Sequence, residues 1–165
     1  LDGPLGFNAP RAEVFPPGLL ERRPVVMFPD SRRPKKEWGG FYELTARLLA
    51  QRPDLPIVWA GNSGPEPALD WPEDRYWNLL GRTPLETLPA LLSAARLVVC
   101  NDSGPMHLAA ALERRVVALF GPTNPVRFGP YPLDSKRHFI VRAPDGRMDR
   151  IAVDYVYEVV AGAAG

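Results

Sequence analysis

Short runs of consecutive apolar residues recur along the chain, and longer segments with a different periodicity separate them. The runs cover residues 25–28, 57–60, 97–100 and 116–120; residues 76–79 and 138–142 are largely apolar segments that include polar residues and are also expected to be strands. A strand that is buried on both faces reads as a continuous apolar run, because side chains on both faces are packed. We therefore expect these runs to form the strands of a mainly parallel sheet.

Helical spacing appears between the runs. Residues 38–52 place Trp38, Phe41, Leu44 and Leu48 on one face of an amphipathic helix. Further helices are expected near 85–95, 105–112 and 151–160, and residues 66–72 are expected to be a short helical or irregular piece.

The segment 83–95 carries two signals about where its helix begins. Thr83 and Glu86 have the spacing of a capping box, with Pro84 at the first helical position. Pro89 then removes a backbone donor early in the helix, and this is expected to shift the start.

Strands that alternate with helices in this way predict an α/β fold with a doubly wound, Rossmann-like sheet. Its length of 165 residues suits one domain, which we place at residues 25–165. Residues 1–24 contain five prolines and no sustained periodicity. We interpret them as a linker or the remnant of an interdomain crossover, and an ordinary irregular N-terminal arm is the alternative.

Composition narrows the possible functions. A net charge of +1 gives no sign of nucleic-acid binding, and no apolar run is long enough to span a membrane. One cysteine and two histidines offer no metal cluster, so we expect no metal site. Cys100 ends an apolar run, which favours a buried, inert thiol over a reactive one.

The segment that follows residues 97–100 carries the strongest candidate chemistry. Asp102, Ser103 and Gly104 lie between a predicted strand and a helix that begins near Pro105. Free N–H groups at such a helix N-terminus can bind an anion, and the Asp102 carboxylate could accept hydrogen bonds from sugar hydroxyls. His107 could donate to a hydroxyl or a phosphate oxygen. Alternatively, Asp102 caps the helix and His107 is a packing residue.

Two other loops follow predicted strands in the same way. Residues 121–125 form a small polar turn in which Thr123 could present its hydroxyl to a phosphate, although a simple tight turn is equally compatible. Residues 30–36 contain Arg32, Arg33, Lys35 and Lys36, which could neutralise a diphosphate. A solvated basic loop is the alternative there.

The run Asp102–Leu112, followed by Gly121-Pro122-Thr123-Asn124-Pro125, resembles the ADP-heptose:lipopolysaccharide heptosyltransferases of glycosyltransferase family 9. Lys36-Glu37-Trp38 and residues 81–85 are similar to two further segments of that family. The resemblance covers residues 24–160 and implies one half of a GT-B fold, the half that binds a nucleoside-diphosphate sugar.

The resemblance also implies roles for individual residues. Lys36 would contact the diphosphate, with Ser31, Arg32 and Arg33 as a supporting phosphate loop. The donor sugar and phosphates would lie against Asp102, Ser103, Gly104, His107 and Thr123. The nucleoside would lie near Glu66, Arg82 and Thr83.

The family's reaction is an inverting transfer whose catalytic base lies in an N-terminal acceptor-binding domain. No residue of this chain matches that base, so we expect no catalytic residue here and no transfer by the chain alone. The resemblance implies a glycan or lipid-linked acceptor such as lipopolysaccharide, a nucleotide sugar as substrate, no metal cofactor, and a cytoplasmic enzyme that is peripheral at the inner face of the membrane.

The chain departs from the family at Asp30, where the family often has glycine, and at Glu37 and Gly39. An acid at position 30 would repel a diphosphate unless Arg32 or Arg33 offsets it. A non-catalytic nucleotide- or phosphosugar-binding module is therefore an alternative function. Half of a GT-B-like sugar-nucleotide epimerase is another.

Overall fold

In the computed structural model, residues 15–31, 33–125, 129–132 and 134–165 are described. Their strands form one parallel sheet in the order β3-β2-β1-β4-β5-β6. The strands are β1 (Val25–Phe28), β2 (Ile57–Trp59), β3 (Tyr76–Asn78), β4 (Leu97–Asn101), β5 (Val116–Phe120) and β6 (His138–Arg142). The predicted doubly wound α/β fold is therefore confirmed.

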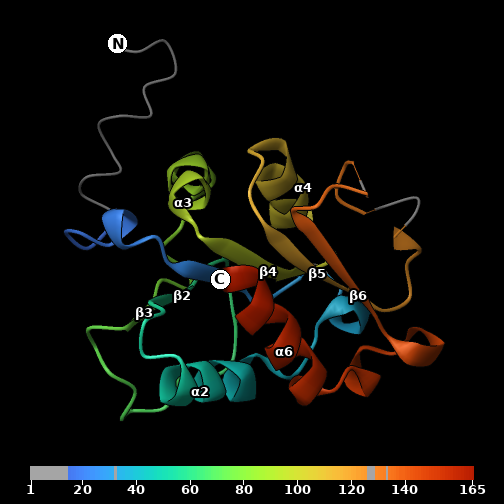
Figure 1. The fold of residues 1–165 in the computed structure, drawn as a ribbon, viewed down its shortest axis with the longest axis horizontal. Helices are drawn as coiled ribbons and strands as arrows, with labels where there is room; N and C mark the ends of the chain where they lie inside the picture. The colour runs from blue at the N-terminus through green and yellow to red at the C-terminus, as the bar shows by residue number, and fades with distance from the viewer. Residues whose placement is uncertain (1–14, 32, 126–128, 133) are drawn as a thin grey trace.

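Helices cover both faces of the sheet (Figure 1). The α-helices are α2 (Phe41–Gln51), α3 (Leu88–Ala94), α4 (Gly104–Ala111) and α6 (Val153–Ala164). Short 3-10 turns are η1 (Leu20–Arg22), η2 (Pro34–Lys36), η3 (Leu85–Thr87), η4 (Pro144–Gly146) and η5 (Met148–Arg150). Helices α2 and α6 lie on one face, and α3 and α4 lie on the other (Figure 1).

Alternate residues of each buried strand supply the two layers of the core. In β1, Val25 and Met27 pack with α2 and α6, whereas Val26 and Phe28 pack with α3 and α4. All four are fully buried, which explains why the strand reads as an unbroken apolar run.

Two predicted helix starts are wrong, and long-range hydrogen bonds explain both. Helix α2 begins at Phe41 rather than at residue 38, since the Trp38 N–H donates to the side chain of Asn101 instead of entering a helix. Thr83 forms no capping box, because its hydroxyl accepts a hydrogen bond from Gly61 N–H. Helix α3 starts only at Leu88, which confirms the expected shift by Pro89.

The end of the N-terminal segment packs on the domain. Phe15 and Leu19 are buried in the same core layer as α3, and Arg22 lies over the ring of Trp77. Residues 1–14 lie outside the described residues, so the interpretation of 1–24 as a linker or crossover remnant stays a prediction. Among the described helices, none is long and apolar enough to cross a membrane.

Candidate functional site

The candidate site lies at the carboxyl edge of the three central strands. Strand β4 is hydrogen-bonded to β1 on one side and to β5 on the other. The loops that follow these strands therefore meet at one edge, which is where open parallel sheets bind ligands. They are the loops predicted from sequence to carry chemistry, at residues 29–36, 101–103 and 121–125.

Asp102 connects the three loops. Its side chain is buried, and Oδ2 lies 3.1 Å from Lys36 Nζ. The Thr123 hydroxyl donates a hydrogen bond to the same oxygen. The structure thus brings together three predicted site residues, and Asp102 holds both partners instead of capping the helix.

The N-terminus of α4 is open beside this cluster. Ser103 is its N-cap residue, but the Ser103 hydroxyl donates to Asn101 O at 3.1 Å and makes no capping hydrogen bond. Nothing lies within 4 Å of the position that a Cβ would take on Gly104. His107 is exposed on the first turn of the helix, so its interpretation as a packing residue is wrong. No side chain caps α4, so N–H groups at the start of this helix remain available to hold an anion.

Asn101 is a fully buried residue whose importance the sequence analysis missed. Its Oδ1 accepts a hydrogen bond from Trp38 N at 3.0 Å. Its Nδ2 donates to Pro29 O at 3.2 Å and to Asp30 O at 3.4 Å. One side chain on β4 therefore fixes both ends of the basic loop that carries Lys36. A polar residue at the end of an apolar run was the only signal in the sequence.

The basic loop is folded on itself by short contacts. The Ser31 hydroxyl donates to Arg33 O at 2.6 Å and accepts from Arg33 N at 3.1 Å. Glu37 accepts a hydrogen bond from Ser31 N at 3.2 Å. Lys36 reaches the cluster, whereas Arg33 is exposed and Arg32 lies outside the described residues. Ser31 therefore shapes the loop. Glu37, at which the chain departs from the family, accepts a hydrogen bond within the same loop.

Asp30 faces the turn after β2. Its Oδ2 accepts a hydrogen bond from Asn62 N at 2.9 Å. Gly61 has a φ of 103°, and a Cβ there would come within 2.6 Å of Asp30 Oδ1. The partner described for the Asp30 carboxylate is thus the backbone N–H of Asn62, and no ion pair between Asp30 and Arg33 is described; Arg32 lies outside the described residues.

The predicted nucleoside-binding residues are only partly brought together. Thr83 accepts from Gly61 N at 3.1 Å, which joins the loop after β3 to the turn after β2. Glu66 and Arg82 are both exposed, and neither has a described side-chain partner. A pocket of about 360 Å³ lies between the loops after β1 and β2, lined in part by Pro29, Trp38 and Gly64.

Two further residues frame the site. A Cβ on Gly121 would come within 2.8 Å of the Met148 side chain, so the turn of Thr123 packs closely on η5.

Cys100 is fully buried, and burial, followed by the nearby charge of Asp102, raises the pKa of its thiol above the usual range. The prediction of a buried thiol is confirmed.

Comparison with known proteins identifies the family of this chain. The model of glycosyltransferase family 9 (heptosyltransferase) matches residues 5–149. Lipopolysaccharide heptosyltransferase 2 of Salmonella typhimurium is 49% identical over 133 residues, which cover 74% of this chain and 37% of that protein. Lipooligosaccharide heptosyltransferase 2 of Haemophilus influenzae is 33% identical over 145 residues, covering 81% of this chain and 40% of that protein. The chain thus spans less than half the length of these curated relatives.

Solved structures share the fold. A structure of E. coli ADP-heptose lps heptosyltransferase II aligns with a TM-score of 0.70 at 27% identity, covering 87% of this chain and 47% of that chain. E. coli heptosyltransferase WaaC with ADP aligns with a TM-score of 0.71 at 24% identity, covering 86% and 44%. The second likeness concerns the fold alone. Together with the family match, these relatives confirm the resemblance, and the chain belongs to glycosyltransferase family 9, the heptosyltransferase family.

Proposed function

We propose that this chain is the donor-binding domain of an inverting heptosyltransferase, and that it binds ADP-heptose for transfer to a lipopolysaccharide acceptor. The observation that carries the proposal is the convergence of Lys36, Asp102 and Thr123 beside the open N-terminus of α4. Relatives named as lipopolysaccharide heptosyltransferases, and the 27% identical structure named as an ADP-heptose lps heptosyltransferase II, support the choice of donor.

Each group at the edge has a task in this proposal. The diphosphate lies over the N–H groups of Ser103 and Gly104, where the helix N-terminus favours negative charge. Lys36 leaves Oδ2 of Asp102 for a phosphate oxygen, which is also a strong partner for an ammonium group. Asp102 then accepts hydrogen bonds from a donor-sugar hydroxyl and from Thr123. His107 donates to a phosphate oxygen.

In the chemical step, the acceptor hydroxyl oxygen forms a bond to the anomeric carbon and gives its proton to a general base. The bond between that carbon and the β-phosphate oxygen breaks, and the leaving nucleoside diphosphate gains negative charge. A cation and fixed N–H dipoles stabilise such a charge without reorganising. We assign that part to Lys36 and α4. The acceptor hydroxyl, its general base and the surface that meets the acceptor are supplied outside this chain.

We also propose that donor binding needs no metal ion. Lys36 and the α4 amides supply the positive charge that a divalent cation would otherwise bring to a diphosphate. Added chelator should leave the affinity for ADP unchanged, and a fall of tenfold or more would contradict this part. We further propose that the complete enzyme works in the cytoplasm at the inner face of the membrane, where a lipid-linked acceptor is reached.

Titration calorimetry with ADP, UDP and GDP tests the function. We expect ADP to bind most tightly and Lys36→Ala to weaken binding at least tenfold, since a charge-assisted contact to phosphate is lost; such contacts contribute about 1.5–3 kcal/mol. Lys35→Ala is the matched control, because Lys35 is exposed in the same turn and makes no described ion pair. No binding of any nucleotide at millimolar concentration would overturn the proposal.

The alternative of a non-catalytic module with a degenerate donor site rested on Asp30 and Glu37. Both carboxylates are engaged by backbone N–H groups, Asn62 N and Ser31 N respectively. No described contact joins either carboxylate to Lys36, Asp102 or Thr123. The structure therefore does not favour that alternative.

A further inference from the structure

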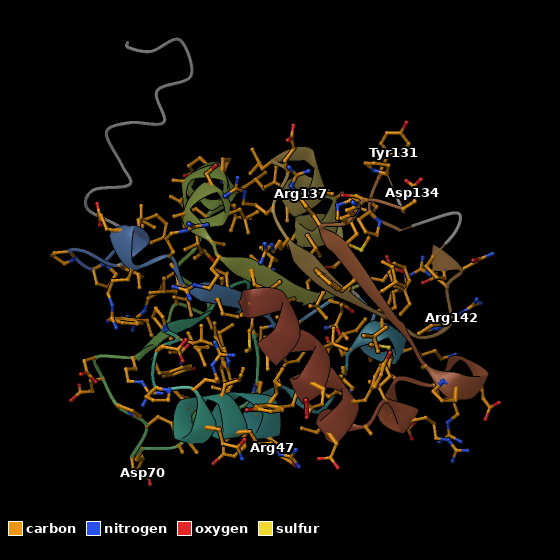
Figure 2. The ribbon with its side chains drawn as sticks, viewed as in Figure 1. Arg47, Asp70, Tyr131, Asp134, Arg137 and Arg142 are labelled. Atoms are coloured by element: carbon orange, nitrogen blue, oxygen red, sulfur yellow. The ribbon has the colours of Figure 1, made fainter. Side chains whose placement is uncertain are left out.

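A second positively charged region lies at the opposite edge of the sheet. Arginines immediately precede three neighbouring strands, at Arg96 before β4, Arg115 before β5 and Arg137 before β6. Parallel strands place these positions at one edge, the amino edge. Figure 2 labels both ends of β6, with Arg137 at its amino end and Arg142 at its carboxyl end.

The sheet register puts two of these arginines side by side. Val116 pairs with His138, so the preceding residues Arg115 and Arg137 are neighbours across the ladder. Strands in a sheet lie about 4.8 Å apart. Like charges at neighbouring positions of a sheet repel each other and destabilise it. The described part of the chain provides no carboxylate in ion-pair contact with either residue.

These arginines line a pocket of about 480 Å³. Arg23 and Arg114 contribute to the same lining, and Glu113 is its one described carboxylate-bearing residue. Five arginines thus line one space, with one acid among the described lining residues. Outside the lining, the pKa of the Asp54 carboxyl is lowered mainly by its hydrogen bond with Arg52 and further by the charge of Arg96. None of the five forms an ion pair with a described carboxylate.

Helix capping accounts for only part of this arrangement. Arg114 donates to Ser93 O and Arg115 to Ala163 O, at 3.2 and 2.9 Å, near the C-terminal ends of α3 and α6. Arg114 also donates to Leu112 O and Arg96 to Arg23 O, each at 3.2 Å. Each guanidinium carries five N–H donors, so these contacts leave most donors unused. The guanidinium groups of Arg23 and Arg137 make no hydrogen bond to a described residue.

We propose that this pocket is a second anion site that binds phosphate groups, separate from the donor site at the carboxyl edge. Planar guanidinium groups match phosphate oxygens with paired hydrogen bonds, and several around one space favour a ligand with more than one negative charge. The ligand class is a phosphate or diphosphate group, carried by a small molecule or by an anionic lipid headgroup. The site does not depend on the function proposed above.

Amide chemical shifts of the isotope-labelled chain, followed while inorganic pyrophosphate is added, test the site. We expect saturable shifts at residues 96–98 and 114–116, separate from any shifts at the α4 N-terminus. The variant R23Q/R137Q should lower the affinity for pyrophosphate, read from the shifts at residues 96–98 and 114–116, at least tenfold. It removes no described side-chain hydrogen bond. Unfolding by urea checks that both proteins are equally stable.

The control variant R147Q/R150Q removes the same charge. Arg147 and Arg150 are exposed arginines that pair with Asp149 and Asp145. The control should leave the amino-edge shifts unchanged. Equal loss of affinity in both variants would overturn the proposal, because it would show only a general charge effect. The absence of any saturable shift at the amino edge would overturn it as well, because it would show that no site exists there.

Vesicle flotation then separates the two sources. Binding to phosphatidylglycerol vesicles but not to phosphatidylcholine vesicles, lost in R23Q/R137Q, identifies a lipid headgroup. Pyrophosphate binding without vesicle binding identifies a soluble phosphate ligand. K36A removes the donor-site cation and should alter neither result, so a failure here is distinguishable from a failure of the proposed function.

Discussion

Replacing Asn101 with leucine should destabilise the domain and loosen the donor site together. The side chain is fully buried and makes hydrogen bonds to Trp38 N, Pro29 O and Asp30 O. Leucine has a similar size but no polar atoms, so these backbone groups lose their partner. Leaving a buried donor or acceptor unpaired costs about 1–3 kcal/mol.

The two shorter contacts, to Trp38 N at 3.0 Å and Pro29 O at 3.2 Å, decide the magnitude. They give an expected loss of about 2–6 kcal/mol in the free energy of unfolding, counting about 1–3 kcal/mol for each group. That is a large part of the ~5–15 kcal/mol by which a domain is usually stable. Urea denaturation measures it, with the slope of the transition expected to stay unchanged.

Asn62→Ala provides the matched control. Asn62 is exposed, and the hydrogen bond described for it uses its backbone N–H, which alanine retains. Its effect should lie within about 0.5 kcal/mol. A loss below about 1 kcal/mol in Asn101→Leu would refute the argument that this amide holds the basic loop, because it would lie below the cost of even one unpaired group. Weaker ADP binding should accompany the loss of stability, as Lys36 is carried by that loop.

The remaining predictions concern the turn after β5 and the buried thiol. Gly121→Ala should destabilise the domain by about 1–3 kcal/mol through overpacking, because its Cβ would lie 2.8 Å from Met148; urea denaturation measures the loss, and adding Met148→Ala should make the combined effect smaller than the sum. An additive result would show that this contact is not the cause. Cys100 should resist a thiol reagent in the folded protein, since burial raises its pKa and bars access; rapid labelling without urea, followed by absorbance, would contradict its buried position.

The sequence predicted the strands better than the helix starts, for a physical reason. Residues 116–120 match β5 at both ends, and this run is apolar and buried throughout. Residues 138–142 match β6 as well, although only Val141 of that strand is buried. The helix starts predicted near Thr83 and Trp38 are wrong because each residue uses its hydrogen-bonding group on a partner distant in sequence. Local signals cannot reveal such a competitor for a helix start.

In the site too, local signals identified candidate residues but not their long-range partners. Spacing and resemblance together placed Lys36, Asp102 and Thr123 among the candidates, and the parallel sheet explains why their loops meet. The sequence could not show that Lys36 and Thr123 share one carboxylate oxygen, nor that Asn101 joins the loops beneath them. Those facts depend on the order of strands β1, β4 and β5 in the sheet.

The most direct test of the donor-site proposal is to map ADP binding by amide chemical shifts. We expect saturable shifts centred on Lys36, Ser103 and Gly104, with the affinity for ADP strongly lowered in Lys36→Ala and unchanged in Lys35→Ala. Saturable ADP binding whose shifts fall elsewhere, and which Lys36→Ala leaves unchanged, would contradict the claim that the diphosphate lies between Lys36 and the N-terminus of α4.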